Sequence, residues 1–165
     1  MKKYEFTGET KEIRLLFRTA TLHRIRATVA FGIVEVGDLG GWIEKEENLS
    51  HEGKAWVWGN AEVWGNAKVW GNAEVWGNAK VFSASHVLVI GAIGSRNDFT
   101  TFYRDKDNEI TVKCGCFLGK IDRFLEKVTQ THGDSKYALV YRAAVEVAKL
   151  QIDLSGEAPK DADEE

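Results

Sequence analysis

The most regular pattern of apolar and polar positions in the chain repeats every six residues from residue 57 onward. The stretch reads VWGNAE, VWGNAK, VWGNAE and VWGNAK, followed by the degenerate hexads VFSASH, VLVIGA and IGSRND. An aliphatic residue fills one position of each hexad, at Val57, Val63, Val69, Val75, Val81, Val87 and Ile93. A small residue comes two positions earlier, at Ala55, Ala61, Ala67, Ala73, Ala79, Ser85 and Gly91. Because residues two apart in a strand share a face, we expect both positions to point into a core.

The Gly-Asn pairs at 59–60, 65–66, 71–72 and 77–78 predict corners between short strands, because glycine and asparagine tolerate positive φ. The repeat resembles the hexapeptide repeat of left-handed parallel β-helices, in which three hexads form one triangular coil. The resemblance implies that residues 18 apart stack, which brings Glu62 beside Lys80. Opposite charges are then in register, as a sheet favours. We therefore predict a short left-handed parallel β-helix.

A stub of this size exposes both of its ends, so the flanking segments are expected to cap it. Residues 1–50 show the period of two that is typical of strands, as in Ile13, Leu15 and Phe17. Segments 99–104 and 109–117 predict a hairpin with its turn at 105–108. Apolar residues at helical spacing in 121–128 and 139–150 predict two helices, the second capped by Ser135.

The predicted fold class is therefore mainly β with a C-terminal α+β part, in four segments. A β-rich cap covers residues 1–50, and the β-helix covers residues 51–96. A ββαα module covers residues 97–152, and a small, acidic and disordered tail covers residues 153–165.

Five short motifs, four of them outside the hexads, resemble a family of phage and prophage proteins. They are GDLGGWIE at 37–44, IGSR at 93–96, TFYR at 101–104, CGCF at 114–117 and TH at 131–132, so the resemblance spans roughly residues 20–150. It implies a phage origin and the host cytoplasm as the location, and it implies no particular biochemical activity.

Composition excludes several classes of protein. With 44% hydrophobic residues and a net charge of −3, the chain is not expected to be disordered. No apolar run approaches the roughly 18 residues of a membrane helix, and residues 1–12 lack the apolar core of a secretory signal. The basic residues Arg14, Arg18, Arg24 and Arg26 favour a solvated strand face over a nucleic-acid site, because no nucleic-acid module is visible. We expect neither a membrane nor a nucleic acid as partner.

Candidate binding chemistry gathers where the repeat ends. Arg96, Arg104, Lys113 and Tyr103 supply two guanidinium groups, an ammonium group and an aromatic ring, which suit a phosphate or a nucleotide. The predicted ligand-binding residues are Ser95, Arg96, Asp98, Tyr103, Arg104, Lys113 and His132. The alternative is that Arg96 pairs with Asp98 and that the other cations are solvated.

Cys114-Gly-Cys116 with His132 suggests a metal site or a thiol nucleophile. Zinc usually needs four ligands, and at least two residues usually separate a pair of thiol ligands. Because both cysteines share strand parity with Ile110 and Val112, they are predicted to be core residues. We predict no metal and no cofactor.

The tryptophans point outward in the repeat. The 18-residue offset pairs Trp58 with Trp76, Trp64 with Phe82 and Trp70 with Leu88. Large apolar groups on every side must be covered, either by the flanking segments or by another subunit. The resemblance to hexapeptide proteins implies a homo-oligomer, with a trimer favoured, packed through Trp58, Trp64, Trp70 and Trp76. A surface that stacks on sugars or bases is the alternative.

We predict a non-catalytic phage accessory protein, an oligomer that sequesters an anionic nucleotide-like molecule such as a host defence signal. Resemblance to hexapeptide proteins also suggests an acyltransferase, with His51, His86 or His132 as base, although no residue is positioned to orient one. The third alternative is a structural spacer or an inhibitor of a host defence enzyme.

Overall fold

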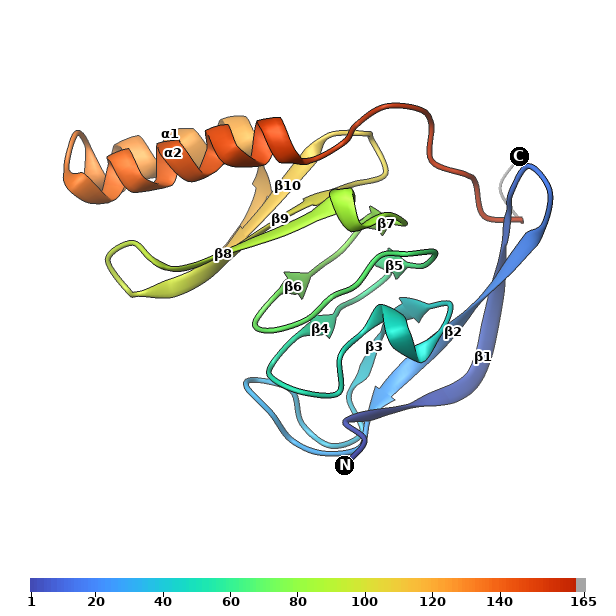
Figure 1. Ribbon diagram of the computed structural model, residues 1–165. Helices are drawn as coiled ribbons and strands as arrows, with labels where there is room; N and C mark the ends of the chain where they lie inside the picture. The colour runs from blue at the N-terminus through green and yellow to red at the C-terminus, as the bar shows by residue number, and fades with distance from the viewer. Residues whose placement is uncertain (163–165) are drawn as a thin grey trace.

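The computed structural model describes residues 1–162, and Figure 1 shows their arrangement. The first strands are β1 (Tyr4–Arg14), β2 (Thr19–Ala27), β3 (Leu39–Ile43), β4 (Trp56–Val57), β5 (Glu62–Val63), β6 (Glu74–Val75) and β7 (Lys80–Val81). They are followed by β8 (Val87–Ile93), β9 (Asp98–Arg104), β10 (Ile110–Cys114) and β11 (Phe117–Lys120). The helices are α1 (Ile121–His132) and α2 (Lys136–Gln151), with short 3₁₀ turns η1 (Glu46–Asn48) and η2 (Ala84–His86).

These strands form sheets of three kinds. A mixed five-stranded sheet has the order β1-β2-β3-β5-β7, and a four-stranded antiparallel sheet has the order β11-β10-β9-β8. Strands β4 and β6 form a small parallel pair. Within residues 1–162 no sheet is closed or forms a solenoid, so the predicted left-handed parallel β-helix is wrong.

The local geometry expected of the hexads is nevertheless present in residues 55–83, which we call the turn stack. Val57 pairs with Val75, and Val63 pairs with Val81, so parallel neighbours are 18 residues apart as expected. The inward positions Ala55, Val57, Ala61, Val63, Ala67, Val69, Ala73, Val75, Ala79 and Val81 are all at most 2% exposed. Gly65 has φ of 62°, and a Cβ there would lie 2.8 Å from the carbonyl oxygen of Phe82. The layers therefore approach so closely at this corner that only glycine fits.

Two features explain why the hexads do not build the expected fold. Strands β5 and β7 continue through β3 into the antiparallel β1–β2 hairpin, so the repeat shares a sheet with the N-terminal segment. After Val81 the hexads lose their Gly-Asn corner. The apolar run Val87–Ile93 consequently extends as β8 and pairs antiparallel with β9.

Of the four tryptophans predicted to pack between subunits, Trp64 is buried within the chain, and Trp58 and Trp76 are half-buried. Trp58 stacks on Trp76 with ring centroids 4.2 Å apart, and Trp64 stacks on Phe82 at 4.7 Å. Trp64 is 5% exposed, because β1, β2 and β3 bring Ile13, Leu22 and Trp42 over it. Trp70, at 63% exposed, is the tryptophan of this set that is left on the surface.

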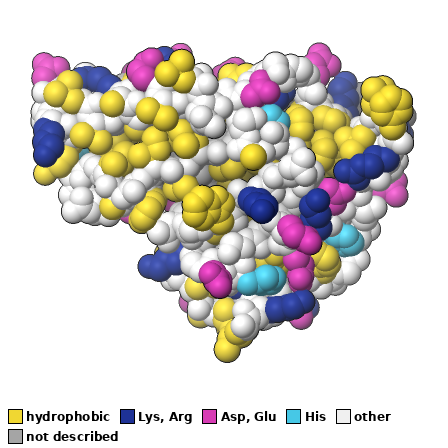
Figure 2. Space-filling model, viewed as in Figure 1, with side chains coloured by type: hydrophobic (Ala, Val, Ile, Leu, Met, Phe, Trp, Pro, Cys, Tyr) yellow, Lys and Arg dark blue, Asp and Glu magenta, His cyan; other side chains and the backbone are white. Residues whose placement is uncertain are grey.

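The flanking segments fold much as their patterns predict. β9 and β10 form the expected hairpin, with Arg104 opposite Ile110, and both helices form. The helices lie side by side on one face of the four-stranded sheet (Figure 1) and bury a second core with it. Ser135 precedes α2, but its side chain makes no capping hydrogen bond. Figure 2 shows hydrophobic side chains gathered over the helical layer, where Leu139, Val147 and Leu150 of α2 are exposed.

Residues 153–162, for which the sequence predicts disorder, run from the helices to the far end of β1 (Figure 1). Arg104 Nη1 donates to the carbonyl oxygen of Ser155 at 3.0 Å. At the other end, the amide of Ala162 donates to the carbonyl oxygen of Glu12, and Asp161 forms ion pairs with Lys11 and Lys80. The last part of the predicted tail, 163–165, lies outside the described residues.

Three of the four arginines predicted to form a solvated face, Arg18, Arg24 and Arg26, have side-chain partners. Arg18 pairs with Glu44 at 2.7 Å, and Arg26 pairs with Glu5 at 2.7 Å. Arg24 donates to the carbonyl oxygen of Gly40 at 2.9 Å. None of the helices in the described part of the chain is both long and apolar enough to span a membrane.

Candidate functional site

A cleft of about 180 Å³ opens where the β8–β9 and β10–β11 turns meet the two helices. Its lining combines cations, aromatic rings and thiols from four segments of the chain. The lining residues are Ser95, Arg96, Asp98, Cys114, Gly115, Cys116, Phe117, Phe124, Lys127, Val128, Thr131, His132 and Tyr141. Four of the residues predicted from the sequence, Ser95, Arg96, Asp98 and His132, are therefore brought together.

Glycines allow the two turns to close in on the cleft. Gly94 has φ of 78°, and a Cβ there would lie 1.9 Å from the Tyr141 hydroxyl oxygen, so no larger residue fits. Gly115 has φ of 57° and is the first residue of a two-residue hairpin turn between Cys114 and Phe117. This is the position that a type II′ turn gives to glycine. A Cβ on Gly115 would lie 3.0 Å from Arg96 Nη1, so the guanidinium rests close to the turn.

Two cations of the cleft are free of ion pairs. Arg96 and Lys127 are exposed, and neither forms an ion pair within residues 1–162. The pairing of Arg96 with Asp98 that the sequence left open is absent, and Asp98 Oδ1 instead accepts a hydrogen bond from the Phe99 amide at 2.7 Å. Two cations face one carboxylate, which leaves this cleft able to bind an anion.

The floor of the cleft is aromatic and is held by a polar contact. Tyr141 is 7% exposed, and Cys114 lies beside it in the lining of the cleft. Burial, and next the neighbouring Cys114, raise the pKa of Tyr141 to about 12, so the phenol is neutral. Cys114 Sγ also accepts a hydrogen bond from Thr100 Oγ1 at 3.3 Å. The ring of Phe124 lies 5.7 Å from that of Tyr141.

His132 closes one end of the cleft as the last residue of α1. Its ring is half-buried and lies 5.7 Å from the rings of both Tyr137 and Tyr141. Arg142 of α2 donates to the carbonyl oxygen of Gly133 at 3.0 Å and to Thr129 Oγ1 at 3.2 Å. This contact satisfies the end of α1 and keeps His132 at the cleft.

Three residues predicted to bind ligand lie elsewhere. Tyr103 is 1% exposed, and its hydroxyl donates to the carbonyl oxygen of Trp76 at 2.9 Å. Burial raises the pKa of the Tyr103 phenol above its ordinary value. Lys113 Nζ donates to the Gly115 carbonyl oxygen and lies 5.2 Å from the Trp76 ring centroid, on the sheet face opposite Cys114. Strand alternation separates both side chains from the cleft.

Arg104 is also structural. It is 1% exposed, and its Nη2 donates to Asn108 Oδ1 at 2.7 Å. The guanidinium lies over the Phe82 ring, at 5.2 Å from its centroid, and holds the chain after α2 through the carbonyl oxygens of Ser155 and Gly156. The sequence placed this cation near Arg96, but it lies at the opposite end of β9.

The prediction that both cysteines are core residues is wrong for Cys116, whereas Cys114 packs against the second core. β10 ends at Cys114, which is half-buried and lines the cleft, and Cys116 is exposed in the turn that follows. The turn breaks the strand parity on which the prediction rested. In the part of the chain that the structure describes, no three His, Cys, Asp or Glu side chains come close enough to hold a metal ion.

Lys127, Tyr141 and Phe117 are cleft residues that the sequence pattern missed. Lys127 is one turn before Thr131 on α1, at the border of the apolar stripe that contains Phe124 and Val128. A position at the border of an apolar stripe indicates that Lys127 lies beside the core. It does not indicate which turn between strands lies opposite Lys127.

Comparison with known protein families gives no match, and comparison with curated proteins gives none either.

Proposed function

We propose that this chain is a non-catalytic binding protein that captures a small anionic, nucleotide-like ligand in the cleft beside the β10–β11 turn. The observation that carries the proposal is the pair of exposed cations, Arg96 and Lys127, that have no ion pair in the described chain and border an aromatic floor. A guanidinium binds a phosphate through two parallel hydrogen bonds, and it is the usual choice for such recognition.

The dimensions of the cleft define which part of a ligand it accepts. Its volume of about 180 Å³ is below the roughly 300–1,000 Å³ of sites that enclose drug-sized ligands. The cleft suits a phosphate group together with part of one ring, which would lie against Phe117 or Tyr141. The remainder of a nucleotide would stay outside.

The biological context is part of the proposal and rests on the motif resemblance. We propose that the protein is a phage accessory protein that acts in the host cytoplasm by sequestering a nucleotide-like defence signal. A homo-oligomer, with a trimer favoured, remains part of this proposal. Because Trp64 is buried and Trp58 and Trp76 are half-buried in a ring stack within the chain, we assign the subunit contact to Trp70 and to the exposed side chains of α2.

An acyltransferase gains no support from the histidines. His51 Nδ1 accepts a hydrogen bond from the Lys3 amide at 3.0 Å, and His86 Nδ1 accepts one from the Phe82 amide at 3.1 Å. His86 is 2% exposed. Both rings therefore serve local packing, and His132 has no hydrogen-bond partner within residues 1–162 that would orient it as a base.

The test is thermal unfolding of the protein with inorganic phosphate, mononucleotides, cyclic dinucleotides and ADP-ribose. A ligand that binds the native state alone stabilises it by about 2.7 kcal/mol at a concentration of 100 times Kd. We expect at least one nucleotide to raise Tm, and we expect Arg96→Ala to abolish the increase. Lys106→Ala is the matched control, because Lys106 is an exposed cation in the β9–β10 turn outside the cleft.

Two results would count against the proposal. The first is that none of these compounds raises Tm. The second is that the increase survives Arg96→Ala, which would place the bound anion elsewhere. Turnover of acetyl-CoA would instead favour the acyltransferase.

A further inference from the structure

The strand β11 forms an open edge of the four-stranded sheet. It is the outermost strand in the order β11-β10-β9-β8 and pairs with β10 alone among the described residues. Its register with β10 is Cys114 opposite Phe117, Lys113 opposite Leu118, Val112 opposite Gly119 and Thr111 opposite Lys120.

This register determines which backbone groups face outward. Phe117 follows a two-residue turn, so it exchanges both hydrogen bonds with Cys114, and the same holds two residues further on for Gly119. Leu118 and Lys120 therefore direct their N–H and C=O groups away from β10. The carbonyl of Lys120 is at the N-cap of α1, where it begins the helical hydrogen bonds. The N–H and C=O of Leu118 and the N–H of Lys120 have no partner within residues 1–162.

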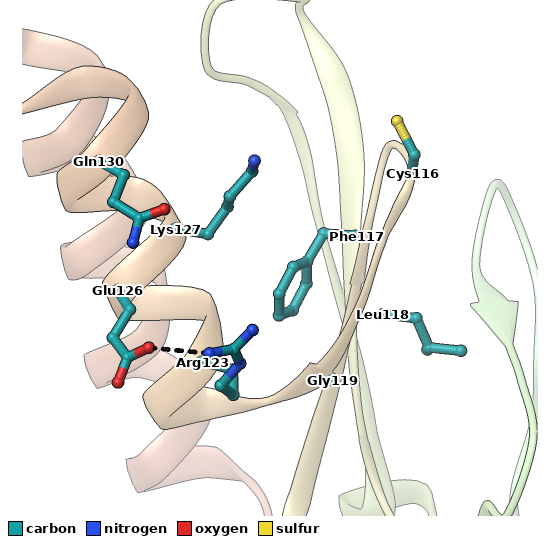
Figure 3. A pocket seen from close by; sticks show the side chains of 8 residues that line it. All are labelled: Cys116, Phe117, Leu118, Gly119, Arg123, Glu126, Lys127 and Gln130. Atoms are coloured by element: carbon teal, nitrogen blue, oxygen red, sulfur yellow. Dashed lines mark hydrogen bonds and ion pairs between the residues drawn. The ribbon is translucent and has the colours of Figure 1, made fainter.

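A groove of about 450 Å³ runs beside this edge, between β11 and α1. Figure 3 shows Phe117 pointing into the groove toward α1, whereas Leu118 points to the other side of the strand. Gly119 has no side chain to obstruct the backbone. The sheet edge, the apolar ring and the helix wall together have the shape that an added strand requires.

The helix wall of the groove is positively charged. Arg123 and Lys127 are exposed cations, and Glu126 is the one acidic residue among the groove residues. Arg123 Nη1 lies 3.2 Å from Glu126 Oε2 (Figure 3), while Lys127 has no ion pair in the described chain. Two cations against one carboxylate favour an acidic occupant.

We propose that the β11 edge binds an extended acidic peptide of a protein partner as an additional strand. The peptide pairs with the outward backbone groups of Leu118 and Lys120. Alternate side chains of the peptide point toward α1, where carboxylates meet Lys127 and Arg123, and the others point toward Leu118. Native sheets commonly protect an edge with proline, a bulge, lysine or a short strand; Phe117–Lys120 contains no proline, but it has four residues and ends in Lys120.

This interaction adjoins the nucleotide site proposed above and shares Lys127 and Phe117 with it. It also uses the backbone of β11, and it does not use Arg96. Arg96→Ala therefore tests the nucleotide site alone, and Leu118→Pro tests the strand edge alone.

Leu118→Pro is the sharpest variant, because it removes an outward N–H that no other described residue uses. Proline is tolerated at such edge positions, so the hairpin should remain folded. Leu118→Ala is the matched control, since it removes the same side chain and retains the N–H. The fold of each variant is checked by far-UV circular dichroism.

The experiment is a titration of the ¹⁵N-labelled full chain with the capped peptide Val-Glu-Val-Glu-Val, followed by amide chemical shifts. We expect saturable shifts at Leu118, Gly119 and Lys120, and about tenfold weaker binding for Leu118→Pro than for Leu118→Ala. The peptide Val-Lys-Val-Lys-Val should bind more weakly than the glutamate peptide to the unmodified chain. Arg96→Ala should leave the shifts unchanged.

Three results would overturn the proposal. They are no shift at millimolar peptide, equal binding to the Pro and Ala variants, and concentration-dependent shifts at these amides without peptide. The last result would assign the edge to a second copy of the chain.

Discussion

The turn stack, residues 55–83, and the sheet–helix layer, residues 87–151, both bury aliphatic and aromatic side chains. They differ in which polar groups are left without a partner. In the turn stack the alanine and valine rows and Trp64 are buried, and Trp58 and Trp76 are half-buried and stack on each other. Its buried charge is also paired, because Glu62 lies 2.5 Å from Lys11 and 3.2 Å from Lys80. This region has little surface chemistry left for a ligand.

The sheet–helix layer buries one face of its sheet and has exposed polar groups at the edge of that face. Arg96 and Lys127 have no ion pair within residues 1–162, Cys116 is exposed, and β11 leaves backbone groups unpaired. The comparison teaches that the conspicuous repeat uses its apolar and charged groups for packing. The irregular turns at the end of the antiparallel sheet hold the exposed cations and the unpaired strand edge on which the proposed binding rests.

The largest expected effect is a difference in stability between variants of a buried and an exposed tryptophan. Trp56 is fully buried against Tyr4 and Phe31, so Trp56→Ala should destabilise the protein by about 3–5 kcal/mol. Trp70→Ala should change the free energy of unfolding of the isolated chain by roughly 0.5 kcal/mol or less. Urea unfolding measures both, and similar losses for the two variants would contradict the buried and exposed assignments.

The second prediction separates two arginines that the sequence grouped together. Arg104→Ala should cost roughly 2–4 kcal/mol of stability, because it removes charged hydrogen bonds to Asn108 and to the carbonyl oxygens after α2. It should leave nucleotide affinity unchanged below its Tm. Arg96→Ala should do the reverse, with stability changed by about 0.5 kcal/mol or less and nucleotide binding lost. Chemical denaturation and calorimetric titration provide the two readouts, and loss of affinity in Arg104→Ala would unite the two residues again.

The third prediction concerns the pH dependence of stability at the boundary of the two regions. Burial, and next Arg104, lower the pKa of His86 from 6.5 to about 4. Between about pH 4 and 6.5 the unfolded chain therefore binds more protons than the native state, so this contribution to stability is lost as the pH falls.

His86→Asn should retain an acceptor for the Phe82 amide and remove the titration. The slope of stability against pH in this window should decrease by at most about 1.4 kcal/mol per pH unit. Urea unfolding at several pH values measures the slope. Because burial also lowers the pKa of His51, the difference between variant and parent is the relevant quantity, and an unchanged slope would exclude His86 as its source.

The smallest expected effect concerns the two thiols, and it tests the geometry of the cleft rim. Cys116 is exposed and should react quickly with a thiol reagent, whereas Cys114 is half-buried and accepts a hydrogen bond from Thr100. Cys116→Ser should remove the fast phase, and Cys114→Ser should remove the slow one. A nucleotide that fills the cleft should slow the reaction of Cys114 further, and equal reaction rates would contradict the predicted difference.

Local geometry was more predictable from the sequence than the assembly of its parts. The inward valines follow from strand alternation, the 18-residue register was implied by the resemblance to hexapeptide repeats, and both are observed. The β9–β10 hairpin and the helices likewise follow from nearby residues. The sheet shared by β3 and β5 was not predictable, because the hexad pattern does not specify what pairs with its first layer.

The site was half predictable for the same reason. Arg96 and His132 were chosen correctly as neighbours of one cleft, because the end of the repeat marks a change in structure. The role of Arg104 was predicted wrongly, because this side chain holds the backbone of residues 153–156. No periodic pattern in the sequence indicates the path of that segment. Lys127 and Tyr141 were missed. From the helical pattern, Lys127 is a residue at the border of the apolar stripe and Tyr141 is a core residue. The pattern does not give the angle at which the helices pack on the sheet, and this angle brings both residues to the cleft.

The most direct test of the central claim is a map of amide and side-chain chemical shifts during titration of the full chain with the nucleotide that raises Tm most. The account predicts that the largest shifts occur at Ser95, Arg96, Gly115 and His132, with little change from residue 55 to residue 83. Shifts concentrated at Trp58, Trp70 and Trp76 would show that the ligand binds the turn stack, and they would contradict the division between scaffold and binding site.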